Sequence, residues 1–277
     1  MPIPLTHPPR AGSESYLNSM QPWRTSLVTS DETSIRVRGY DVTELMEHAS
    51  FVDTIFLLHR GRLPNHAERK LLNAILTSVA DHGAGAPSCA TARLVASGNR
   101  QSLSAAIAAG VLAIGDEHGG AGSACMELIA AGVERARKES ISIAESARLT
   151  LEDARTKVAR LPGLGHRVHT IDPRVAVLFE MAKSVGVRTE GVEFMLALER
   201  EAAIRIKPLP INVDGALAAI LYDLGFEPSA GKLMFIIGRV AGLSAEVAEE
   251  YAREKPMRIK IPVEYDGEPP RALKMPE

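Results

Sequence analysis

The stretch Leu161-Pro162-Gly163-Leu164-Gly165-His166-Arg167-Val168-His169 interrupts a chain that is otherwise rich in helical patterns. Two glycines within three residues, after a proline, are incompatible with a regular helix or a packed strand. Such a loop lets a ligand approach the peptide groups closely, and it carries His166, whose residue type titrates near neutral pH. The stretch therefore predicts either a ligand-binding loop with an acid–base histidine or a tight loop whose histidine caps a carbonyl group.

The segment that follows, Asp172-Pro173-Arg174, predicts the start of a helix. Aspartate is a good N-cap, and proline is favoured at the first helical position. A glycine-rich loop, a histidine and a helix N-terminus near arginines together indicate an anionic ligand.

The overall composition limits the possible classes of protein. The 277-residue chain has 45% apolar residues, 24% charged residues and a formal net charge of -2, which is typical of a globular protein and argues against a general nucleic-acid binder. No stretch approaches about 20 consecutive apolar residues, so we expect no membrane span. The proline-rich N-terminus predicts an extended arm. Cys89 and Cys125 have no CxxC spacing and imply neither zinc nor a disulfide framework, so a reducing, cytoplasmic setting is expected.

Helical periodicity covers most of the chain and is not interleaved with strands, so the predicted fold class is all-α. A small N-terminal β-hairpin is expected within residues 25–38, and Ser50 with Asp53 fits a capping box. The tail after Pro256 predicts a short strand or an arm, and residues 133–160 predict exposed helices. Further helices are expected at 65–79, 102–114, 123–132, 173–185, 191–206, 215–224 and 229–254.

Three polar residues, His118, His166 and Asp214, each occur at a glycine-associated break between apolar helices. Because 48 residues separate each from the next, they can meet only in the folded core. Two histidines and a carboxylate supply a base, an acid and a hydrogen-bond donor. The set lacks zinc-type spacing, so we predict no metal. The chain contains no GxSxG elbow, which argues against a serine hydrolase. The structural alternatives are an N-cap for Asp214 and a carbonyl-bonded, buried ring for His118.

Several short segments, taken in their order along the chain, form a pattern: Arg38-Gly39-Tyr40, Ala80-Asp81-His82-Gly83, Asp116-Glu117-His118-Gly119-Gly120-Ala121, Gly163-Leu164-Gly165-His166-Arg167-Val168, Asp172-Pro173-Arg174, Asn212-Val213-Asp214-Gly215 and Ile237-Gly238-Arg239. Together they resemble the citrate synthase superfamily from about Thr25 to Gly267. Within it the chain most resembles the citryl-CoA lyase branch, which includes the lyase portion of ATP-citrate lyase. His118, where some lyase relatives have phenylalanine, is a synthase-like feature.

The resemblance implies a citrate synthase-like, two-domain helical fold that assembles as a homodimer. Residues 1–118 and 223–277 are expected to form the large domain and residues 119–222 the small domain, with the site in the cleft between them. No cofactor is expected to be permanently bound, because the coenzyme A thioester is a substrate. The implied partners are acetyl-CoA or citryl-CoA and an oxaloacetate-type dicarboxylate, with no nucleic acid and no membrane.

The resemblance also implies roles for individual residues in the cleavage of citryl-CoA. His166 removes the proton of the hydroxyl group, His118 donates a hydrogen bond to the thioester oxygen, and Asp214 protonates the carbanion carbon. The residues expected to bind the carboxylates are His82, Arg174, Arg239 and Arg258, and those expected to line the pantetheine channel are Gly163, Leu164 and Gly165.

Other functions remain open from the sequence. The chain could be a short citrate synthase or a 2-methylcitrate synthase-type acyltransferase, or it could act on a related 3-hydroxy-3-carboxyacyl-CoA. It could also be a non-catalytic paralogue that binds CoA esters. The three proton-competent residues His118, His166 and Asp214 argue against a pure binder, which needs none of them.

Overall fold

The computed structural model describes residues 23–158, 160–165, 172–273 and 275. His166 and His169 therefore lie outside the described residues. The chain divides into two compact units, residues 1–64 and 65–277. The division expected within the second unit, with residues 119–222 as a small domain, stays a prediction.

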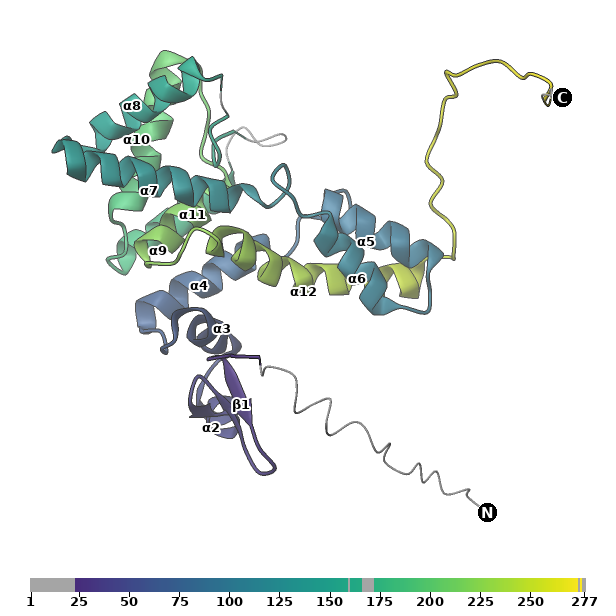
Figure 1. The fold of residues 1–277 in the computed structure, drawn as a ribbon, viewed down its shortest axis with the longest axis horizontal. Coiled ribbons are helices and arrows are strands. Elements are labelled where there is room, and N and C mark those ends of the chain that lie inside the picture. Colours follow the sequence, from purple (N-terminus) through teal and green to yellow (C-terminus); the bar gives the residue numbers. More distant parts are fainter. Residues whose placement is uncertain (1–22, 159, 166–171, 274, 276–277) are drawn as a thin grey trace. The chain divides into compact units, whose positions relative to one another are not determined.

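The first unit contains the predicted β-hairpin. β1 (Val28–Ser30) and β2 (Ile35–Val37) pair antiparallel, with Val28 opposite Val37, and β3 (Tyr40–Asp41) adds a short third strand that the sequence did not indicate. α2 (Val42–His48) and α3 (Phe51–Arg60) follow (Figure 1). The capping box at the start of α3 is confirmed: Ser50 and Asp53 each bond to the backbone N–H of the other.

The second unit is helical, which confirms the predicted fold class. α12, which has 24 residues, contacts α4, α5, α6, α7 and α11. The helices in chain order are α4 (His66–Val79), α5 (Pro87–Gly98), α6 (Leu103–Leu112), α7 (Ala121–Glu139), α8 (Ile143–Thr156), α9 (Pro173–Ser184), α10 (Glu190–Arg205), α11 (Val213–Asp223) and α12 (Ala230–Arg253).

The sequence did not indicate α5, and α7 continues to Glu139 instead of ending at Gly132, whereas the irregular tail fits the arm that was one of its two expected forms. α5 was not predicted, because its buried side chains are mainly alanine, serine and cysteine and so produce little hydrophobic contrast; Pro87 at its first turn was the available signal. The tail from 256 to 273 contains no strand and extends as an irregular segment with many exposed apolar side chains. None of the described helices combines the length and the apolar character needed to cross a bilayer.

The N-terminal turns of α7 and α12 cross at two glycines. A Cβ atom on Gly231 would lie 2.4 Å from the carbonyl carbon of Gly122 and 2.6 Å from the nitrogen of Ser123. The hydroxyl of Ser123 fixes the crossing, because it accepts the N–H of Lys232 at 3.0 Å. The contact is between backbones, so neither helix can yield by rotating a side chain.

We expect Gly231→Ala to lower the free energy of unfolding by about 2 kcal/mol, because the two helices must separate to admit the methyl group. Gly85→Ala is the matched control, since a Cβ there would meet nothing within 4 Å. Urea unfolding of both variants measures the difference. Equal stabilities of the two variants would contradict the close helix crossing.

Candidate active site

Two segments that are distant in the sequence lie side by side just before Asp214. The N–H of Gly165 donates to the carbonyl oxygen of Pro210 at 2.7 Å, and the N–H of Asn212 donates to that of Gly163 at 3.0 Å. The side chain of Asn212 adds a bond from Nδ2 to the carbonyl oxygen of Gly165 at 2.7 Å, while its Oδ1 caps α11. The predicted ligand-binding loop is thereby attached to the N-terminus of α11.

Glycine is required where these segments meet. Gly163 has a φ of +83°, and a Cβ atom there would lie 2.6 Å from Sγ of Cys125 and 2.7 Å from Cα of Gly215. A Cβ atom on Gly215 would in turn lie 2.4 Å from the carbonyl oxygen of Gly163. The two backbones approach this closely only because neither residue has a side chain. The role of Gly163, Leu164 and Gly165 in binding pantetheine stays a prediction.

The chain returns to α11 at Asp172. Oδ2 of Asp172 accepts the N–H of Val213, the first residue of α11, at 3.1 Å. The described residues on both sides of 166–171 are therefore bonded to the segment that leads into Asp214. This arrangement is compatible with the predicted meeting of His166 and Asp214, although His166 itself is outside the described residues.

Asp214 lies in the first turn of α11, and its Oδ1 is buried without a hydrogen-bond partner among the described residues. Burial raises the pKa of this carboxyl to about 6; the charge on Asp172 acts in the same direction, whereas Arg174 and Arg239 oppose it. The N-cap of α11 is Asn212, so the structural alternative for Asp214 is wrong. A carboxyl with such a pKa is suited to transfer a proton near neutral pH.

His118 lies in a tight turn in which it exchanges two backbone hydrogen bonds with Gly115, of 2.9 and 3.1 Å. Its Nε2 accepts the backbone N–H of Ser88 at 3.2 Å and lies 2.9 Å from the Ser88 hydroxyl. Because Nε2 accepts an N–H, this contact assigns the ring hydrogen to Nδ1. The partner of Nε2 is thus the first turn of α5, and the alternative of a carbonyl-bonded ring stays a prediction for Nδ1.

Arg239 links His118 with the surroundings of Asp214. Its side chain is buried, and Nη1 donates to the hydroxyl of Ser88 at 3.1 Å. Since the Ser88 oxygen accepts from Arg239, its own hydrogen is available for Nε2 of His118. The guanidinium group also lies over the ring of Phe235, 4.9 Å from its centroid.

Both Arg174 and Arg239 bond to the C-terminal end of α4. Nη1 of Arg174 donates to the carbonyl oxygen of Ser78 at 3.0 Å, and Nε of Arg239 donates to that of Val79 at 2.9 Å. The carbonyl end of a helix attracts cations, so the backbone itself orients the two guanidinium groups. The exposed His82 follows α4 directly. Hydrogen bonds and charges therefore connect five residues around the end of α4: Ser88, Asp172, Arg174, Asp214 and Arg239.

Sequence reasoning missed two of these residues. Ser88 bonds to a histidine that is 30 residues away, and no local pattern indicates that contact. Asp172 was recognised only as a helix start, whereas its carboxylate also bonds to a second helix, 41 residues further along the chain.

Comparison with known proteins identifies the family of the chain. The family described as "Citrate synthase, C-terminal domain" matches residues 18–70 and 65–260. The chain belongs to the citrate synthase family. The family recognition made from the sequence segments is thereby confirmed.

Among solved structures, this citrate synthase family member is similar to the citryl-CoA lyase of Hydrogenobacter thermophilus, with 36% identity and a TM-score of 0.83 over 92% of this chain and 98% of that chain. The ATP citrate lyase of Methanosaeta concilii, solved with (3S)-citryl-CoA, shares the fold at 17% identity and a TM-score of 0.71, covering 96% of this chain and 46% of that chain.

The curated relatives include a probable ATP-citrate synthase of Caenorhabditis elegans, 29% identical over 208 residues, which are 72% of this chain. The chain spans only 18 to 30% of the length of the first curated relatives that it matches.

Within one chain, Arg258 does not contact the described residues around Asp214 but bonds to the end of α12. Its Nε donates to Oε1 of the buried Glu250 at 2.8 Å, and it also lies 3.1 Å from Glu254. Glu250 is eleven residues beyond Arg239 on α12, which corresponds to about 16 Å along the helix. The role of Arg258 in binding carboxylates stays a prediction.

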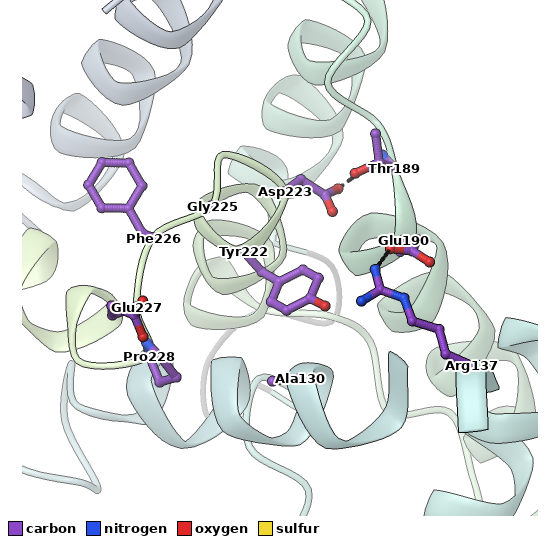
Figure 2. A pocket seen from close by; sticks show the side chains of 10 residues that line it. All are labelled: Ala130, Arg137, Thr189, Glu190, Tyr222, Asp223, Gly225, Phe226, Glu227 and Pro228. Carbon is purple, nitrogen blue, oxygen red and sulfur yellow. Dashed lines mark hydrogen bonds and ion pairs between the residues drawn. The ribbon is translucent and has the colours of Figure 1, made fainter. Parts of the chain in front are cut away.

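A cavity of about 410 Å³ lies among α7, the start of α10 and the end of α11 (Figure 2). An ion pair between Arg137 and Glu190 lies at it, and Asp223 accepts the N–H groups that begin α10. Asp223 is nine residues from Asp214, or about 13 Å along α11. This cavity is therefore separate from the site around Asp214.

One group of side chains in the described part of the chain has metal-ligand chemistry: Asp81, Cys89 and Glu246, whose ligand atoms lie within 4.8 Å of one another. Burial and the charge of Asp81 raise the pKa of the Cys89 thiol, and Glu246 is bonded to Arg93. A protonated thiol and a paired carboxylate are poor metal ligands.

Asp214→Asn should stabilise the protein above pH 6. In the wild type the folded state holds the proton more tightly than the unfolded state, because the pKa rises from 3.8 to about 6 on folding. The stability contributed by this group is therefore present below about pH 4 and lost as the pH rises to about 6. The variant should gain up to about 2–3 kcal/mol at pH 7.5 and only about 0.5 kcal/mol at pH 4. Urea unfolding at both pH values tests this; a pH-independent difference contradicts it.

The ring of His118 should carry its hydrogen on Nδ1 at pH 7. Nitrogen-15 NMR of the histidine-labelled protein distinguishes the two tautomers, with Ser88→Ala as the comparison that removes the hydroxyl contacts with His118 and Arg239 but keeps the backbone N–H of residue 88. A ring protonated on Nε2 would contradict the bond from the Ser88 N–H.

Proposed function

We propose that the chain is a citryl-CoA lyase-like enzyme that cleaves citryl-CoA into acetyl-CoA and oxaloacetate, or forms the same C–C bond in reverse. One observation carries the proposal: Asp214, whose Oδ1 is buried and whose carboxyl has a pKa of about 6, interacts electrostatically with two arginines, one of which is linked through Ser88 to His118. Similarity to a citryl-CoA lyase over 92% of the chain supports it.

In the cleavage direction His166 takes the proton of the citryl hydroxyl group, and that oxygen becomes the ketone of oxaloacetate. The electron pair of the breaking C–C bond passes into the acetyl group, which leaves as the enolate of acetyl-CoA. Asp214 gives its proton to the enolate carbon. One proton is taken up and one is released, so His166 and Asp214 exchange protonation states without net proton uptake.

The enolate needs stabilisation of the charge that develops on the thioester oxygen. Nδ1–H of His118 supplies this hydrogen bond, because the contact of Nε2 with Ser88 leaves the ring hydrogen on Nδ1. A donor fixed before the reaction loses no free energy to reorientation as the charge forms.

The carboxylates of the four-carbon partner bind to Arg174 and Arg239, with His82 beside them and Arg258 as a further candidate. Planar guanidinium groups suit carboxylates because they offer paired N–H donors. Gly163, Leu164 and Gly165 line the channel of the pantetheine arm, and the CoA thioester is a substrate with no permanent cofactor. We further propose a homodimer, closure of domain 119–222 on the rest of the chain, and a cytoplasmic location.

A synthase differs from this lyase by hydrolysing the acyl-CoA intermediate. The same proton-transferring residues serve condensation, so a short citrate synthase or 2-methylcitrate synthase-type enzyme is the second candidate. Acetyl-CoA or propionyl-CoA mixed with oxaloacetate distinguishes the two: a synthase releases CoA thiol, and a lyase releases none.

Asp214→Ala and His166→Ala should each lower citryl-CoA cleavage by about 10³-fold, the range expected for loss of a general acid or base. The assay follows oxaloacetate by coupled reduction, and circular dichroism verifies the fold. Asp223→Asn, at the other end of α11, is the control and should retain activity. Near-normal turnover by either site variant rejects the mechanism, and a wild type that cleaves no citryl-CoA rejects the function.

A further inference from the structure

The carboxylate of Asp172 makes more bonds than a helix cap requires. The residue is buried; its Oδ1 accepts the backbone N–H of Arg174 at 3.1 Å and the Nε–H of Arg174 at 2.9 Å. Its Oδ2 accepts Nη2 of Arg174 at 2.8 Å and the N–H of Val213 at 3.1 Å. All four lone-pair positions of the carboxylate are thus used. An N-cap needs only the first of these bonds.

These bonds join three helices at the candidate site. Asp172 begins α9, Val213 begins α11 directly before Asp214, and Arg174 continues to the carbonyl oxygen of Ser78 in α4. The bidentate contact fixes the plane of the guanidinium group, which a single bond to the backbone does not.

We propose that Asp172 is a positioning residue, which holds the guanidinium group of Arg174 and the first turn of α11 in one unit so that Arg174 and Asp214 face the same bound dicarboxylate. The inference rests on the proposed function, since it assigns Arg174 to the carboxylates and Asp214 to the proton transfer. It adds a residue that does not itself touch the substrate.

The charges around Asp214 give the proposal a measurable consequence. The charges of Asp172 at the N-cap of α9, Arg174 on α9 and Arg239 on α12 act on Asp214, and the charge of Asp214 acts on the thiol of Cys125 on α7. Asp172 raises the pKa of Asp214 and also offsets the positive charge of Arg174, which lowers it. Removing the charge of Asp172 therefore lowers the pKa of Asp214, because the effect that raises it is lost while the opposing effects of Arg174 and Arg239 remain.

The test compares Asp172→Asn with Asp223→Asn. Asp223 is the matched control, because it is another aspartate that caps a helix, accepting the N–H groups of Thr189, Gly191 and Val192. Carbon-13 NMR of aspartate-labelled protein follows the titration of Asp214, and calorimetry follows the affinity for oxaloacetate. Asp172→Asn should lower the pKa of Asp214 by about one unit and weaken oxaloacetate binding about tenfold.

In turnover, the acid limb of the kcat/KM profile should move to lower pH by a similar amount, and KM for the dicarboxylate should rise. Asp223→Asn should lower thermal stability without either change. If Asp172→Asn behaves like the control, Asp172 is only a structural cap and the proposal fails.

Asp172→Glu keeps the charge and covers the case in which the amide variant does not fold. It should leave the titration of Asp214 near the wild-type value while weakening oxaloacetate binding, because the longer side chain displaces Arg174. Wild-type affinity in this variant overturns the proposal. If the wild type cleaves no citryl-CoA but Asp172→Asn shifts both the titration and the affinity, the proposed reaction fails and the positioning role stands.

Discussion

The backbone pairing between residues 163–165 and 210–212 is the interaction on which the site depends. It joins a loop in the middle of the chain to the start of α11, and only glycine at Gly163 and Gly215 allows the two backbones to approach so closely. Closing a connection of this length costs conformational entropy, which the surrounding helix packing offsets. The second attachment, from Asp172 to Val213, fixes the other side of the loop. Any substitution that separates these segments also separates Asp214 from its charged neighbours.

Burial of the Asp214 carboxylate lowers the stability of the folded protein at neutral pH. A carboxylate whose Oδ1 is buried without a partner loses hydration, and the protein does not restore it with a direct hydrogen bond from the described residues. Arg174 and Arg239 limit the loss by their positive charge, whereas Asp172 counteracts them. The result is a carboxyl group poised between its charged and neutral forms. Strain of this kind is characteristic of residues retained for chemistry, since a purely structural position would favour an amide or an apolar side chain.

Local patterns in the sequence were enough to find most helices and to recognise the family. Asn65 and Asp172-Pro173 start helices where their capping chemistry predicts, because the N-cap bond involves only neighbouring residues. The contacts of Ser88 with His118 and Arg239 join residues 30 and 151 positions apart, so they depend on how α5, α6 and α12 pack and leave no periodic signal. α5 was missed for a related reason: its small side chains permit close packing but give weak contrast along the sequence.

The two arginines are oriented by the protein before any ligand arrives, because each bonds to a carbonyl oxygen at the end of α4. A dicarboxylate that binds to their remaining N–H groups would therefore bind donors that are already oriented, with little cost of reorganisation. In the proposed reaction its negative charge also offsets the two cations that lower the pKa of Asp214, so binding of the four-carbon partner is expected to raise that pKa further. Asp214 would then become a stronger base in the condensation direction only after the partner is in place, which would couple proton transfer to substrate order. A higher titration midpoint of Asp214 in the presence of oxaloacetate measures this coupling directly.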